Sequence, residues 1–104
     1  MRFQKEYDLI IHEIIWKQKF VEKLSFKHRV SIEEAEEVLG GKTVVRKVSR
    51  GHIKGEDVYA AYSQINTGRY LIVFFINKEK NRALPISARD MDRAERRYYE
   101  RQRA

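Results

Sequence analysis

Five residues in this sequence have side chains that could bind a phosphate group or transfer a proton beside it. Arg69 and Arg89 are each predicted at the end of a β-strand, where a side chain leaves the core while a stiff backbone holds it. Their planar guanidinium groups match phosphate oxygens in two places and stabilise developing negative charge. His28 is a candidate for proton transfer, because imidazole titrates near neutral pH, and Glu56 or Asp57 is the competing candidate.

The net charge of +7 is concentrated in two segments. Residues 17–29 contain five Lys or Arg against one Glu, and residues 42–54 contain five with no acid. Such charge attracts the phosphates of nucleic acids. We therefore predict nucleic-acid contacts from six basic side chains and one aromatic ring: Lys23, Lys27, Arg46, Lys47, Arg50, Lys54 and Tyr99. Two alternatives stay open, namely a basic protein without a polyanionic partner and a packing role for Tyr99.

Four glutamates close together invite comparison with a metal site: Glu33, Glu34, Glu36 and Glu37. No histidine and no second acidic cluster accompany them, so we interpret them as the solvent-facing side of a helix. The chain has no cysteine, which excludes disulfides, thiolate metal sites and thiol nucleophiles. We therefore predict no metal and no cofactor.

The candidate side chains depend on a sheet centred on residues 69–76. After Arg69, seven consecutive apolar or aromatic residues predict a strand buried on both faces. Short links favour hairpins to strands at residues 58–64 and 82–89. Residues 69–76 are thus expected to form the middle of three antiparallel strands.

The strand at residues 82–89 determines where Arg89 points. Regular alternation places Arg89 on the face opposite Leu84, Ile86 and Ala88, so its side chain should not be needed in the core. Pro85 cannot donate to a strand ladder, which indicates an edge strand or a bulge.

Three helices are predicted around this sheet. The first is a basic helix from residue 17 whose apolar stripe recurs every four residues: Trp16, Phe20, Leu24 and His28. In it, His28 has an alternative role of satisfying carbonyl groups at the helix end. The second begins with a capping box of Ser31 and Glu34 and ends at Gly40. The third begins at Asp90 or Asp92 and packs through Met91, Ala94 and Tyr98.

Arg89 also has an alternative, structural role at the start of this third helix. It could pair with Asp92 or Glu95 and cap the helix.

The elements combine into one α+β domain over residues 1–104. With a first strand at residues 8–16 and a short strand at residues 43–48, the predicted order is β-α-α-β-β-β-β-α. This fold has two N-terminal helices, a mostly antiparallel sheet of four to five strands and one C-terminal helix. The chain has 104 residues, enough for one modest core, and neither a membrane span nor a signal peptide is visible. We therefore expect a cytoplasmic protein.

Three stretches together resemble the BrnT family of bacterial toxins. They are Trp16 with the later segment HRVSIEEAEEV (residues 28–38), GRYLIV (residues 68–73), and ISAR (residues 86–89) followed by Arg93, ERR (residues 95–97) and Tyr99. The resemblance spans residues 16–100. It departs from the family at Lys17, where the family often has Asp, and at Arg29, where it often has Gly.

The resemblance implies a RelE-like fold and a metal-independent ribonuclease, the toxin of a type II toxin-antitoxin system. It also implies an RNA substrate and a small cognate antitoxin, of the ribbon-helix-helix or a similar DNA-binding type, in a toxin-antitoxin hetero-oligomer. The family motifs point to Arg69 and Arg89 as well. Two other classes stay open: a non-catalytic nucleic-acid-binding relative, and a protein-targeting or inert antitoxin-binding relative.

Overall fold

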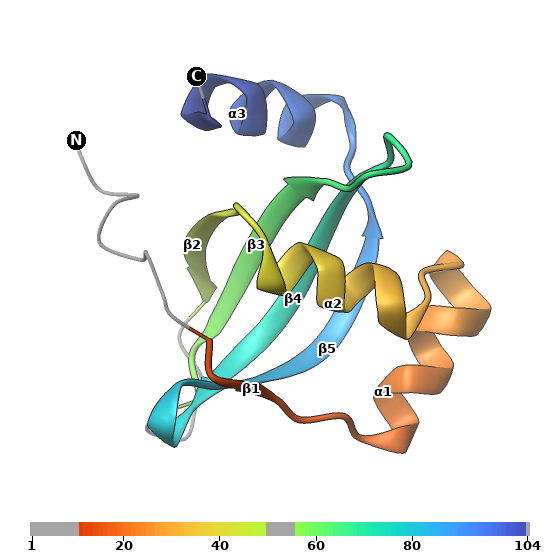
Figure 1. Ribbon diagram of the computed structural model, residues 1–104, viewed down its shortest axis with the longest axis vertical. Coiled ribbons are helices and arrows are strands. Elements are labelled where there is room, and N and C mark those ends of the chain that lie inside the picture. The colour runs from red at the N-terminus through yellow and green to blue at the C-terminus, as the bar shows by residue number, and fades with distance from the viewer. Residues whose placement is uncertain (1–10, 50–55, 104) are drawn as a thin grey trace.

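The fold is built on a five-stranded sheet in the order β1-β5-β4-β3-β2 (Figure 1). The computed structural model describes residues 11–49 and 56–103. In chain order the elements are β1 (Glu13–Ile14), α1 (Gln18–Lys23), the π-helical turn η2 (Leu24–His28), α2 (Ile32–Gly40), β2 (Val44–Ser49), β3 (Val58–Gln64), β4 (Tyr70–Lys78), the short helical turn η3 (Glu79–Asn81), β5 (Arg82–Asp90) and α3 (Arg93–Arg103). The predicted α+β class and the predicted order of elements are confirmed.

β4 is the central strand, as the apolar run predicted. It pairs antiparallel with β3 on one side and with β5 on the other. Leu71, Ile72 and Val73 are all buried, so both faces of β4 are covered at this level. Because successive side chains of a strand point to opposite faces, Ile72 belongs to a different layer from its two neighbours.

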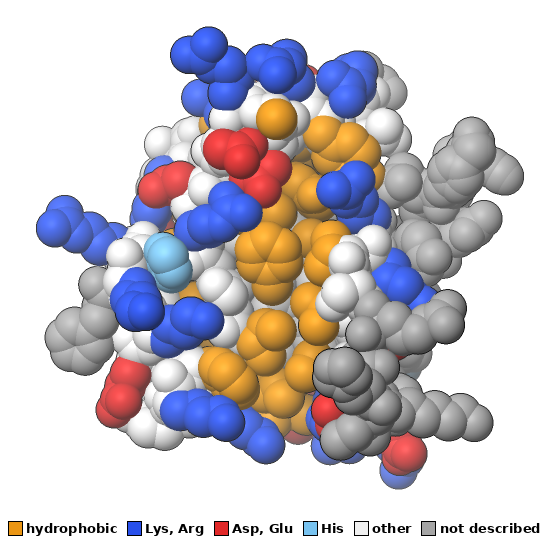
Figure 2. Space-filling view, turned by 180° about the vertical axis from the view of Figure 1, so that it is seen from behind, with side chains coloured by type: hydrophobic (Ala, Val, Ile, Leu, Met, Phe, Trp, Pro, Cys, Tyr) orange, Lys and Arg blue, Asp and Glu red, His pale blue; other side chains and the backbone are white. Residues whose placement is uncertain are grey.

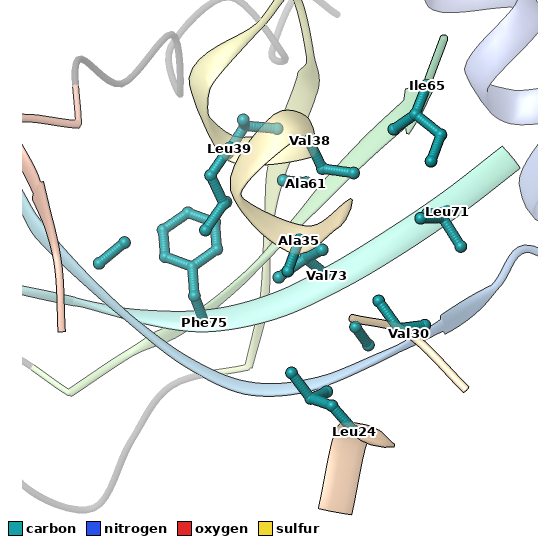
Figure 3. Close-up of a cluster of buried hydrophobic side chains, with 13 residues drawn as sticks. Leu24, Val30, Ala35, Val38, Leu39, Ala61, Ile65, Leu71, Val73 and Phe75 are labelled. Atoms are coloured by element: carbon teal, nitrogen blue, oxygen red, sulfur yellow. The ribbon is translucent and has the colours of Figure 1, made fainter. Parts of the chain in front are cut away.

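α2 covers one face of the sheet. The Ser31 hydroxyl accepts from the Glu34 N–H at 3.0 Å and the Glu34 carboxylate accepts from the Ser31 N–H at 3.0 Å, which confirms the predicted capping box. Fully burying a Val or Leu side chain contributes roughly 1.5–3 kcal/mol, so packing rather than capping supplies most of the attachment. Figure 3 shows the buried side chains of α2 over those of β4: Ala35, Val38 and Leu39 against Leu71, Val73 and Phe75.

The first strand is shorter than predicted, and the first helix changes its type along its length. In the described residues the first strand comprises only Glu13–Ile14, which pairs in parallel with β5, and residues 8–10 lie outside the described ranges. The sheet is therefore mixed. The predicted basic helix is present as α1, but it continues into the wider π-turn η2 and ends at His28.

A β-bulge at Ile86 changes which residues share a face with Arg89. The register between β4 and β5 shifts at this point, so one residue of β5 has no partner. Ala88 lies on the α2 face, opposite Arg89, as expected. Leu84 lies on the same face as Arg89, and the prediction for Leu84 was wrong because alternation does not continue through a bulge. Pro85, predicted at an edge or a bulge, is buried beside the bulge.

α3 covers one end of the opposite face (Figure 1). The Asp92 carboxylate accepts from the Glu95 N–H at 2.7 Å and the Glu95 carboxylate accepts from the Asp92 N–H at 2.8 Å, so Asp92 rather than Asp90 caps the helix. Tyr99 is the buried residue of α3, whereas Ala94 is exposed. The predicted stripe was wrong at Ala94, because a tyrosine ring buries far more apolar surface than a methyl group.

Candidate active site

Arg69 and Arg89 lie at the same end of the sheet but on opposite faces. Arg69 directly precedes β4 and donates to Glu34 at the start of α2. Arg89 pairs with Ile72 of β4 and donates to Glu95 of α3. Since α2 and α3 cover opposite faces, the sheet separates the two guanidinium groups. The structure therefore does not bring the two predicted phosphate-binding arginines together.

Arg69 joins three parts of the chain. Its Nε and Nη2 donate to the two Asp90 carboxylate oxygens at 3.1 and 3.3 Å. Its Nη1 donates to the Glu34 carboxylate at 3.0 and 3.1 Å and to the Arg29 carbonyl at 3.0 Å. The pKa of Arg69 is raised chiefly by its bond to Asp90. All three guanidinium nitrogens thus bind protein, which makes Arg69 a residue that holds α2 against the sheet.

Replacing Arg69 with alanine is expected to lower the free energy of unfolding by about 2 kcal/mol, because hydrogen bonds to charged groups contribute about 1.5–3 kcal/mol and solvent screens part of this. The backbone bond from Ser31 and the bond from Arg69 lower the pKa of Glu34 below 4.5. Ionised Glu34 therefore stabilises the fold above pH 4.5, and this contribution is lost as the pH falls through the lowered pKa. Thermal unfolding of the wild type and of Arg69→Ala measures this difference in stability. We expect the difference to be constant near neutral pH and to become smaller in acid.

The control for this prediction is Arg82→Ala. Arg82 donates to the Glu79 carbonyl at 3.1 Å and makes no ion pair within the described residues. We expect its melting temperature to change little. An equal loss of stability in the two variants would contradict the role of the ion pair. A loss of stability in Arg69→Ala that stays the same in acid would contradict it as well.

Arg89 and Glu95 form a two-pronged ion pair on the other face. Arg89 Nη1 and Nη2 donate to the two Glu95 carboxylate oxygens at 2.7 and 2.8 Å, and the side chains are 36% and 20% exposed. The bond from Arg89 lowers the pKa of Glu95, and the bond to Glu95 raises the pKa of Arg89. Both groups are therefore charged at neutral pH. The structure shows the pairing that the sequence left open as a structural role, at a place that solvent reaches.

Aromatic rings and a second arginine surround this pair. The Arg46 guanidinium carbon lies 4.8 Å from the centre of the Tyr98 ring, whose centre is 5.0 Å from that of Tyr62. The Arg89 guanidinium carbon lies 5.4 Å from the centre of the Phe74 ring. Burial raises the pKa of both tyrosines, so their hydroxyls keep their protons at neutral pH. We call these six residues the sheet-face cluster: Arg46, Tyr62, Phe74, Arg89, Glu95 and Tyr98.

The sheet face continues beyond α3 as an open surface. Figure 2 shows a strip of hydrophobic side chains running down this face with Lys and Arg on both sides. The register places Phe74, Ile76 and Leu84 on this face, and Phe74 and Ile76 are half-buried. Half-buried aromatic rings beside guanidinium groups suit single-stranded nucleic acid, because bases stack on the rings while phosphates bind the cations.

A family model described as ribonuclease toxin, BrnT, of type II toxin-antitoxin system matches residues 16–95. The chain belongs to the BrnT family. No curated protein that was compared with the chain matches it. As a BrnT ribonuclease toxin, the chain has an RNA target and a cognate antitoxin. The match includes five of the six cluster residues and ends at Glu95, before most of α3. A likeness to RelE toxins stays a prediction.

The glutamates of the BrnT motif in α2 hold other elements in place. Glu34 binds Arg69, Glu36 accepts from the Trp16 indole N–H at 2.9 Å, and Glu37 accepts from the Asn66 N–H at 2.6 Å. All four glutamates reach solvent, as predicted, since two are exposed and two half-buried. Three of them also bind elements distant in sequence, which the sequence did not predict.

Arg29, where the BrnT family often has Gly, has a backbone conformation that favours glycine. Arg29 has φ +55°, in the left-handed region that favours glycine. A side chain here costs roughly 1–2 kcal/mol. The hydrogen bond from Arg69 Nη1 to the Arg29 carbonyl fixes this turn.

His28 and Glu56, the predicted proton-transfer residues, do not belong to the sheet-face cluster. His28 ends η2, which precedes α2. Glu56 accepts from Lys78 Nζ at 2.7 Å. Lys78 is six strand residues, about 20 Å, from the Ile72 that pairs with Arg89. Glu56 therefore lies at the far end of the sheet from Arg89.

The predicted nucleic-acid contacts occupy different surfaces. Arg46 lies in the sheet-face cluster, Lys23 and Lys27 are exposed on α1 and η2, and Lys47 pairs with Asp57 at 2.9 Å. Two candidates lie outside the described residues: Arg50 and Lys54.

Tyr99 has the packing role that the sequence left open. It is 6% exposed, and its hydroxyl accepts from the Gln64 N–H at 3.2 Å. Its ring meets the Tyr70 ring edge-on at 6.1 Å between centres. Because the ring is buried, it is not accessible for the nucleic-acid contact that the sequence predicted.

Sequence reasoning did not assign Glu95, Tyr62 or Tyr98 to the candidate site, although it gave Glu95 and Tyr98 structural roles. Glu95 had a usable signal, because it stands three residues after Asp92 at the start of a helix and six after Arg89. The two tyrosines had none, since their contact depends on how α3 lies on the sheet. Within residues 11–49 and 56–103, no group of acidic and histidine side chains could hold a metal, and no helix is long and apolar enough to cross a membrane.

Proposed function

We propose that this BrnT protein is a metal-independent endoribonuclease whose reaction takes place at the sheet-face cluster. The observation that supports this is the two-pronged pair of Arg89 with Glu95 beside the Arg46 guanidinium. It provides two cations for a phosphate and one ionised carboxylate for a proton, on a rigid sheet. These groups suit the attack of a ribose 2′-hydroxyl on the neighbouring phosphate.

In the proposed reaction, Glu95 takes the proton of the 2′-hydroxyl and the 2′-oxygen bonds to phosphorus. Arg89 and Arg46 donate hydrogen bonds to the non-bridging oxygens as negative charge develops. The bond from phosphorus to the 5′-oxygen then breaks. Tyr98 retains its proton because burial raises its pKa, and it protonates the leaving oxygen. The products are a 2′,3′-cyclic phosphate and a 5′-hydroxyl.

RNA binding would make Glu95 a stronger base. The bond from Arg89 is the largest cause of its lowered pKa in the free protein. A bound phosphate competes for the same guanidinium, which weakens that bond and raises the pKa of Glu95. Proton transfer is therefore favoured when substrate is present.

The proposed function is tested with purified protein and a single-stranded oligoribonucleotide in the presence of EDTA. We expect cleavage to continue and mass spectrometry to find 2′,3′-cyclic phosphate ends. A substrate with 2′-deoxyribose at the cleaved position should stay intact, because the nucleophile is missing. Cleavage that stops with EDTA and returns with Mg²⁺ would refute the metal-independent mechanism.

We also propose that the antitoxin is a small DNA-binding protein, of the ribbon-helix-helix or a similar type, and that it forms a hetero-oligomer with this chain in the cytoplasm. The open apolar strip with its basic flanks supports the binding of a protein partner, because an acidic and partly apolar segment would complement it (Figure 2). The DNA-binding type of the partner is what the resemblance to the BrnT family implies. Failure of the product of the neighbouring gene to co-purify with this chain would count against this partner.

A non-catalytic RNA-binding relative is the second candidate. The same ion pair favours it, because both terminal nitrogens of Arg89 already bind Glu95 and the cation is partly neutralised. Such a protein would bind RNA with strong salt dependence and leave it intact. The oligoribonucleotide assay separates the two candidates.

A further inference from the structure

The outer side of α3 carries positive charge that the proposed reaction does not use. Figure 2 shows basic side chains gathered along the top of the molecule, where α3 lies in Figure 1. A hollow of about 610 Å³ lies there, and six residues line it: Met91, Arg93, Arg96, Arg97, Glu100 and Arg101. Helical spacing places Arg93, Arg97 and Arg101 in one row on the side of α3 opposite Glu95. We call these three residues the α3 arginine row.

The carboxylates closest to this row in the sequence are engaged by other groups, including Asp92, which accepts from the Glu95 N–H. Both glutamates of α3 are engaged, Glu95 by Arg89 and Glu100 by the Tyr70 hydroxyl at 2.6 Å and Arg103 at 3.8 Å. Within the part of the chain that the structure describes, no ion pair or hydrogen bond involves a side chain of the row.

The row is unfavourable for the folded protein by itself. Like charges four residues apart on a helix repel each other. Arg93 is also the first residue of α3, where the helix dipole disfavours a cation. All three side chains are exposed, so core packing does not explain them. An anionic partner would offset both unfavourable terms.

We propose that the α3 arginine row binds the phosphate backbone of the RNA strand outside the cleavage position. This inference rests on the proposed function and adds a subsite that holds RNA without taking part in the reaction. Successive arginines stand ~6 Å apart along the helix axis, so they can contact successive phosphates of an extended strand. Guanidinium groups suit this role because their fork matches phosphate oxygens. Because α3 carries Glu95 on one side and the row on the other, a strand leaving the sheet-face cluster reaches the row around α3.

The test compares Arg97→Gln/Arg101→Gln with Lys17→Gln/Lys19→Gln, which removes equal charge from exposed positions at α1. The probe is a single-stranded oligoribonucleotide with 2′-O-methyl groups, which cannot be cleaved. For the arginine variant we expect Kd to rise roughly 10–100-fold and the slope of log K against log salt to fall by about 1.4, since each single-strand phosphate contact contributes about 0.7. The lysine variant should change Kd less than about twofold. Fluorescence anisotropy over a KCl series measures both.

Cleavage of unmodified RNA separates this subsite from the reaction itself. We expect the arginine variant to raise KM while kcat stays within about twofold, because the row does not contact the reacting phosphate. Its melting temperature should not fall, since repulsion within α3 is reduced. If the variant loses affinity for the probe and the wild type cleaves no RNA, the result would support RNA binding by the α3 arginine row and refute the proposed ribonuclease activity.

Two outcomes overturn the inference. If the arginine variant is active and its Kd and KM are unchanged, the α3 arginine row does not bind RNA, and the proposed ribonuclease function is not affected. Lost affinity for poly-glutamate with unchanged affinity for the RNA probe would assign the row to an acidic protein partner instead.

Discussion

Replacing Arg89 with alanine is expected to slow RNA cleavage by about 100-fold or more, as removal of other donors to a developing anion does. The reason is that Arg89 is the cation of the sheet-face cluster with the most rigid support, from β5 and from its ion pair with Glu95. Single-turnover cleavage at saturating protein measures the effect. Because the sequence predicted that the Arg89 side chain is not needed in the core, the sequence alone implies little change in the melting temperature. The ion pair corrects this to a loss of about 1 kcal/mol, or roughly 4–8 °C.

Two further variants define what Arg89 supplies. Arg89→Lys should recover only part of the rate, because it keeps the charge and loses the two-pronged geometry. Arg82→Ala removes an arginine from the same strand and the same face at the far end of β5, and it should leave the rate unchanged. Full activity of Arg89→Ala with a lowered melting temperature would leave Arg89 a purely structural residue.

Glu95→Gln is expected to lower kcat by roughly 10²–10⁴-fold, the usual contribution of a general base. Glutamine keeps the size of the side chain and cannot take the proton. In the wild type, kcat/KM should rise with pH as Glu95 deprotonates, and the lowered pKa places this rise below pH 4.5. The rise of kcat itself should lie at higher pH, because bound phosphate weakens the bond from Arg89.

The pH profile also decides between Glu95 and the histidine suggested by the sequence. An imidazole base would place the acidic limb of kcat/KM closer to neutral pH than a carboxylate base does. We expect His28→Ala to retain both the rate and the profile of the wild type. A limb near neutral pH that disappears in His28→Ala would return the role of base to His28 and refute the assignment to Glu95.

Interactions between residues close in sequence were predictable from the sequence. The Ser31–Glu34 capping box joins groups three residues apart, so the four residues from 31 to 34 contain all the information. The strands at residues 58–64 and 82–89 and the central strand followed from side-chain type and from short links that permit only hairpins. The BrnT motifs likewise depend on residue type and order, so the family was recognisable before the fold.

The tertiary structure alone decided which of these residues meet. One bulged residue, Ile86, interrupts the alternation that placed Leu84 on the face opposite Arg89. The residues around Ile86 do not show in the sequence that the register shifts there. Arg69 and Arg89 are both at strand ends by sequence, but a sheet has two faces, and only the positions of α2 and α3 show that these arginines point apart. Glu95 differs from these arginines, because its pairing with Arg89, six residues earlier, was an alternative that the sequence already offered. The structure decided that Arg46 and two tyrosine rings from other strands and from α3 surround this pair.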